Sequence, residues 1–94
     1  MTELLTDRDI EDAQLEHWTV SEKSLTRTVE LGSFRAAIEA VTRVADAAEE
    51  ADHHPDIDIR WRTLTFTLST HSAGGLTQKD VDLARRIDAL ISSR

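Results

Sequence analysis

The chain has 94 residues, no cysteine, 39% hydrophobic residues and a formal net charge of −7, which fits one globular domain over residues 1–94. Without cysteine there is no disulfide, thiolate zinc site or cysteine nucleophile, and an acidic charge without a basic cluster disfavours nucleic acid as a partner. No apolar run reaches the roughly 18 residues that span a bilayer, and the acidic N-terminal segment is unlike a signal peptide, so we expect a cytoplasmic protein without membrane contact.

The first third of the chain predicts a short helix and two short strands. Thr6 suits a helix N-cap, because its hydroxyl can bind a free backbone N–H of the first turn, and Ile10 follows at helical spacing. Residues 18–20 are predicted to form a first strand. Residues 25–31 alternate apolar and polar side chains as a second strand would, although Arg27 falls on the apolar side.

A long helix is predicted next, capped at its start by Gly32–Ser33. Its apolar residues recur at spacings of three and four, which indicates one buried stripe. The stripe consists of Phe34, Ile38, Val41, Ala45 and Ala48. The helix must end before Pro55, because the residue that precedes a proline is pushed toward an extended backbone.

Two further strands follow the proline. Apolar and polar residues alternate over residues 57–61 and again over residues 64–69, which predicts two strands with one buried face each. A hairpin that turns near Trp61–Arg62 pairs residues whose numbers sum to about 123. Residues 53–55 would then lie opposite residues 68–70.

The last helix has the clearest predicted start. Thr77 and Asp80 have the spacing of a capping box, and Leu76 with Val81 has the spacing of a hydrophobic staple. The element order is therefore helix, two strands, helix, two strands, helix. Two hairpins with few crossovers favour an α+β fold, an antiparallel four-stranded sheet with helices packed on one face.

The predicted register brings His53 and His54 to the end of the sheet where His71 stands, while His17 stays unplaced. The first interpretation of these histidines is structural, since histidines near a helix end can bind free carbonyls and a loop histidine can be solvated. Acid–base chemistry is the second interpretation, because imidazole exchanges protons near neutral pH. A metal site is the weakest, because adjacent side chains of an extended segment point to opposite sides. The residues alone leave all three open.

The spacing around these histidines resembles that of the pterin-4a-carbinolamine dehydratase family. The family pattern is an acidic residue, three others, His-His-Pro, five others, an aromatic residue, nine others, His, and then eight or more before Asp. This chain meets the pattern with Glu49, residues 53–55, Trp61, His71 and Asp80.

The resemblance implies a hydro-lyase that converts 4a-hydroxytetrahydropterin to quinonoid dihydropterin and so recycles the pterin cofactor of aromatic amino-acid hydroxylases. It implies no metal and no cofactor for this chain. It assigns catalysis to His53, His54 and His71. It also implies contacts to the substrate or to these histidines from a second set of residues: Trp18, Glu49, Asp52, Ser69, Thr70 and Asp80.

Within the second set, Glu49 and Asp52 are expected to orient the imidazoles, while Trp18 and the backbone of residues 69–70 are expected to cradle the flat ring. Helix capping by itself accounts for Asp80. We expect the remaining residue of the pattern, the aromatic one at position 61, to serve packing rather than substrate contact.

Relatives of this family also include non-catalytic proteins, namely dimerisation partners of a transcription factor and assembly chaperones for Rubisco. A protein-interaction module on the same fold is therefore the alternative function, and retention of all three histidines favours the enzyme. A chain of this size buries only about 60–65% of its unfolded surface, so we also expect a homodimer or homotetramer.

Overall fold

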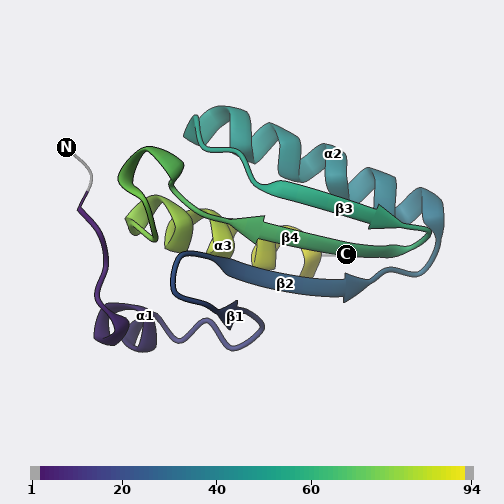
Figure 1. The fold of residues 1–94 in the computed structure, drawn as a ribbon. Helices are drawn as coiled ribbons and strands as arrows, with labels where there is room; N and C mark the ends of the chain where they lie inside the picture. The colour runs from purple at the N-terminus through teal and green to yellow at the C-terminus, as the bar shows by residue number, and fades with distance from the viewer. Residues whose placement is uncertain (1–2, 93–94) are drawn as a thin grey trace.

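A computed structural model describes residues 3–92 and shows, within them, a four-stranded antiparallel sheet with α2 and α3 on one face (Figure 1). The elements in chain order are α1 (Asp7–Ala13), β1 (Thr19–Val20), β2 (Leu25–Glu30), α2 (Phe34–Ala51), β3 (Asp56–Arg60), β4 (Thr63–Leu68), a 3₁₀ turn (His71–Ala73) and α3 (Gln78–Ser92). The strand order is β1-β2-β4-β3, so two hairpins meet along β2 and β4. The predicted α+β class and sheet are confirmed.

The β3–β4 hairpin has the register that the sequence predicts. Asp56 pairs with Thr67 and Arg60 pairs with Thr63, and both pairs sum to 123. The turn between the strands is Trp61–Arg62, and Trp61 has a positive φ of 56°. The side chain of Trp61 is 69% exposed, so the expectation that it serves packing within the chain is wrong.

The sheet and the helices share one core. Its largest fully buried apolar side chains come from two strands and two helices: Leu25, Leu64, Phe66, Leu68, Val44, Val81, Leu83 and Ile87. Arg27, on the apolar side of β2, forms an ion pair with Asp88 of α3. This pairing explains how a charged residue is tolerated on the buried face of a strand, because its charge is neutralised locally.

Helix α2 buries a different face from the predicted stripe. The buried residues of α2 are small: Ala36, Ala37, Ala40, Val44, Ala47 and Ala48. Phe34 is 52% exposed and Ile38 is 37% exposed, and Ala45 is exposed as well. The predicted stripe is therefore wrong at Phe34, Ile38 and Ala45. Val41 is half-buried against the core and Ala48 is buried, as predicted. Small side chains allow the helix axis to approach its neighbours closely, and this leaves the larger apolar side chains outside.

The alanine face of α2 gives a direct test of this packing. Ala40→Leu is expected to destabilise the fold by about 1–3 kcal/mol, because the added side chain has no space in a close-packed interface. Ala45→Leu, on the exposed face of the same helix, is expected to change stability by less than about 0.5 kcal/mol. Urea denaturation of both variants checks the assignment, and equal effects would contradict it.

Candidate active site

The candidate site lies at one end of the sheet, where four segments meet (Figure 1). The C-terminal end of α2 and the start of β3 lie beside the end of β4 and the loop that leads into α3. The register of the hairpin, continued beyond the last pair, places residue 53 opposite residue 70. Segments that are far apart in the sequence therefore bring the predicted histidines to one edge of the molecule.

The end of α2 determines how the two adjacent histidines lie. Asp52 adopts a left-handed conformation with φ 51° and ψ 43°, and its N–H donates to the carbonyls of Ala48 and Glu49. The His53 N–H also donates to the Ala48 carbonyl, at 3.1 Å. These bonds form the usual hydrogen-bonded end of a helix, which reverses the chain within two residues. His53 is buried as a result, whereas His54 is exposed.

His53 lies in a buried polar cluster. Its Nε2 is 2.6 Å from Oδ1 of Asp80, whose side chain is fully buried. The other carboxylate oxygen of Asp80 accepts from the hydroxyl of Thr70 at 2.7 Å and from the backbone N–H of Thr77 at 2.9 Å. The two threonine hydroxyls are 2.8 Å apart. Each polar group therefore has a partner, which burial of a carboxylate requires.

His54 has a separate partner on the surface. Its Nε2 is 2.5 Å from Oε2 of Glu49, one turn before the end of α2, and both side chains are exposed. A carboxylate that accepts from one ring nitrogen fixes which nitrogen carries the proton and leaves the other available. The contact agrees with the expectation that Glu49 orients an imidazole.

His71 begins the 3₁₀ turn that follows β4, and its side chain is exposed. The turn is held by Thr70, whose N–H donates to the Gly75 carbonyl at 2.9 Å, and by Gly74, whose φ of 77° suits glycine. His71 is thus adjacent in sequence to a residue that binds Asp80, and Asp80 binds His53. His53 and the segment that carries His71 are therefore joined through this cluster, whereas the exposed His54 binds Glu49 outside it.

Four other predicted residues have different surroundings from those expected. Trp18 is 6% exposed and its indole N–H donates to Asp88 of α3 at 2.9 Å, so it packs in the core. The backbone N–H and carbonyl of Thr70 are bonded within the loop, so they are not free to hold a ring. Ser69, just before it, is half-buried. Asp52 ends α2 and has no hydrogen bond to a histidine among the described residues.

Asp80 is also revised, because a fully buried carboxylate cannot touch a bound substrate directly. Its carboxylate contacts His53 from the buried side. Its bond to the Thr77 N–H is half of the predicted capping box, but the Thr77 hydroxyl turns to Thr70 instead of completing it. Sequence reasoning named Thr70 only as part of the ring cradle and Thr77 only as a helix cap, so it did not predict that their hydroxyls meet beside Asp80.

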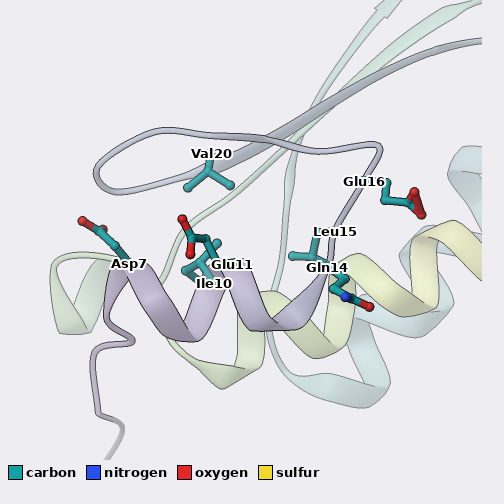
Figure 2. Close-up of a pocket in the computed structure, with 7 residues that line it drawn as sticks. All are labelled: Asp7, Ile10, Glu11, Gln14, Leu15, Glu16 and Val20. Atoms are coloured by element: carbon teal, nitrogen blue, oxygen red, sulfur yellow. The ribbon is translucent and has the colours of Figure 1, made fainter.

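A hollow of about 770 Å³ lies between α1 and the start of the β1–β2 hairpin (Figure 2). Its lining is acidic and apolar: Asp7, Ile10, Glu11, Gln14, Leu15, Glu16 and Val20. No histidine lines it, so it offers no acid–base pair of the kind that the candidate site offers. Within residues 3–92, no group of three His, Asp or Glu side chains is placed to hold a metal ion.

Comparisons with known proteins agree with the geometry. Residues 3–90 match the family model described as pterin 4 alpha carbinolamine dehydratase. A relative from Nocardia farcinica, named for this dehydratase, is 65% identical over 91 residues, which cover 95% of this chain and 96% of the relative. One from Roseiflexus castenholzii with the same name is 53% identical over 93 residues, which cover 97% of this chain and 100% of the relative.

Two solved structures are similar. A transcriptional coactivator/pterin dehydratase from Brucella melitensis aligns with a TM-score of 0.89 and 29% identity, covering 94% of this chain and 98% of that one. A pterin dehydratase-like protein described as a RuBisCO assembly factor of the alpha-carboxysome aligns with a TM-score of 0.64 and 23% identity, covering 78% and 84%. The second likeness shows the fold alone. No helix within the described part of the chain is long and apolar enough to cross a membrane.

Proposed function

The chain belongs to the pterin 4 alpha carbinolamine dehydratase family, and on that premise we propose that it dehydrates 4a-hydroxytetrahydropterin to quinonoid dihydropterin. The observation that carries the proposal is the grouping of three histidines at one end of the sheet. His53 and His54 each contact a carboxylate, and His71 is exposed next to Thr70, which binds the carboxylate that His53 contacts.

The reaction needs an acid and a base on one bound ring. The hydroxyl on C4a leaves as water after it accepts a proton, while N5 loses its proton and its electron pair forms the new C4a=N5 double bond. Imidazole can serve either step near neutral pH, and each positioned group is typically worth about 10²–10⁴ in rate. We assign the two proton transfers to His53 and His71, and the binding or orientation of the ring to His54.

Direct assay tests the proposal. Synthetic 4a-hydroxytetrahydropterin is mixed with the purified protein, and its loss is followed by ultraviolet absorbance against buffer alone. We expect dehydration well above the buffer rate. A rate no faster than buffer would reject the enzyme and favour the alternative, a protein-interaction module on the same fold. The structural likeness to a protein described as a coactivator as well as a pterin dehydratase is the reason to keep that alternative.

We also propose that the protein forms a homo-oligomer through the free edge of β3 and the outer face of α2. Large apolar side chains are exposed there: Phe34, Ile38, Ile59 and Trp61. The backbone N–H of Leu31 donates to the carbonyl of Arg62 at 2.8 Å, which places the β3–β4 turn beside the segment that leads into α2. A patch of this kind on a small protein is typical of an interaction surface, and a second copy would enlarge the small core.

Ile59→Lys tests the oligomer. The wild-type protein is expected to sediment as a dimer or a larger assembly, and the variant is expected to sediment as a monomer, because a lysine on the edge strand cannot be buried unpaired. Val20→Lys is the matched control, since Val20 is 47% exposed on β1 at the opposite edge of the sheet. A monomeric wild type, or dissociation caused by Val20→Lys alone, would contradict this interface.

A further inference from the structure

The buried cluster around Asp80 has a single consistent direction for its hydrogen bonds. An ionised carboxylate only accepts, so the hydroxyl of Thr70 must use its one hydrogen to donate to Asp80. The same oxygen of Thr70 can then only accept from Thr77, at 2.8 Å, which makes the Thr77 hydroxyl the donor. The Thr77 hydroxyl therefore donates to the Thr70 hydroxyl, which in turn donates to the Asp80 carboxylate.

Similar reasoning locates the proton in the hydrogen bond between Asp80 and His53. Imidazole is a stronger base than a carboxylate, so the proton between His53 Nε2 and Asp80 Oδ1 belongs to the ring. His53 Nδ1 makes no hydrogen bond to residues 3–92, and it is not among the buried atoms that lack a partner. Nδ1 is therefore the ring nitrogen left for chemistry.

We propose that Thr70 and Thr77 are positioning residues that act through Asp80 to hold His53 in the Nε2–H form, with Nδ1 free to move the proton of the reaction. The part about Nδ1 rests on the proposed function, whereas the tautomer does not. Among the described residues, no lysine or arginine contacts Asp80, so hydroxyl and amide donors are what fix its orientation.

Helix capping does not explain the two hydroxyls. In a complete capping box the Thr77 hydroxyl would accept from the Asp80 N–H, but that N–H binds the Thr77 carbonyl at 3.0 Å. Thr77 is fully buried and Thr70 is 4% exposed. Valine has nearly the same shape and would fill either position without needing a partner for a hydroxyl. The hydroxyls therefore serve the carboxylate.

The test compares isosteric variants by nuclear magnetic resonance and by kinetics. Long-range ¹H–¹⁵N correlation spectra at a pH where the ring is neutral report which nitrogen of His53 carries the proton. The wild type is expected to show one form, protonated on Nε2. Thr70→Val and Thr77→Val are expected to show a mixture of both forms and to lower kcat about tenfold with little change in KM, the size typical of lost supporting hydrogen bonds.

Thr70→Ser and Thr77→Ser keep the hydroxyl and are expected to restore both the single form and kcat. Circular dichroism confirms that each variant is folded, and the serine variants decide the question if a valine variant does not fold. Valine variants with the wild-type spectrum and kcat, serine variants as impaired as the valine ones, or a wild-type His53 protonated on Nδ1 would each overturn the proposal. A wild type without dehydratase activity would instead reject the proposed function, and the spectra alone would then decide the tautomer.

Discussion

His71→Ala is expected to lower kcat/KM for 4a-hydroxytetrahydropterin by about 10²–10⁴ and to leave the fold unchanged. The loss is expected because the proposed function assigns one of the two proton transfers to His71. The fold should not respond, because His71 is exposed and none of the described hydrogen bonds involves its side chain. Substitutions at such surface positions usually change stability by less than about 0.5 kcal/mol.

The measurement is the initial rate of substrate loss over a range of substrate concentrations, together with urea denaturation of the same preparation. His17→Ala is the matched control, because His17 is also an exposed histidine but lies before β1, away from the cluster around Asp80. We expect its kcat/KM to equal that of the wild type. Unchanged kinetics in His71→Ala, or an equal loss in His17→Ala, would contradict the assignment of His71.

The register that forms the site is predictable from the sequence, because two local signals agree on it. The proline forces the chain into an extended conformation after α2, and strict alternation on both sides of Trp61 fixes which residues face the core. A slip of one residue would turn every apolar side chain of β3 and β4 to the solvent. The turn at Trp61–Arg62 then sets the sum of 123, which brings residue 53 opposite residue 70.

The buried face of α2 is not predictable in the same way. Both of its faces carry apolar residues at helical spacing, so periodicity alone cannot choose between them. The spacing of Phe34 and Ile38 predicted one face, but the buried face is the one with the alanines. Which face is buried is a property of the whole assembly of elements, and no local window of sequence contains it.

The contact between the Thr70 and Thr77 hydroxyls was not predicted, for a related reason. Thr70 and Thr77 are joined only because the loop of the 3₁₀ turn brings its two ends together, as the bridge between Thr70 and Gly75 shows. The residue types did indicate one end of the cluster, since Asp80 has the spacing of a capping residue. The residue types did not indicate that the second carboxylate oxygen of Asp80 contacts His53, which comes from another part of the chain.

Asp80→Ala is expected to destabilise the fold by about 3–5 kcal/mol, the largest effect of any substitution proposed for this chain. The change removes the partner of three donors: the His53 ring N–H, the Thr70 hydroxyl and the Thr77 backbone N–H. Each unsatisfied buried donor costs about 1–3 kcal/mol. For a domain of this size, the melting temperature should fall by at least about 12 °C.

Asp82→Ala is the matched control for this loss. Asp82 lies two residues further along α3, and within residues 3–92 its exposed carboxylate accepts only from the Gln78 side chain, at 2.9 Å. Its removal should change stability by less than about 0.5 kcal/mol. Urea denaturation of both variants separates the loss of a negative charge near the start of α3 from the loss of a buried acceptor. A cost for Asp80→Ala no larger than that for Asp82→Ala would mean that water replaces the carboxylate, and that the cluster does not hold His53 in place.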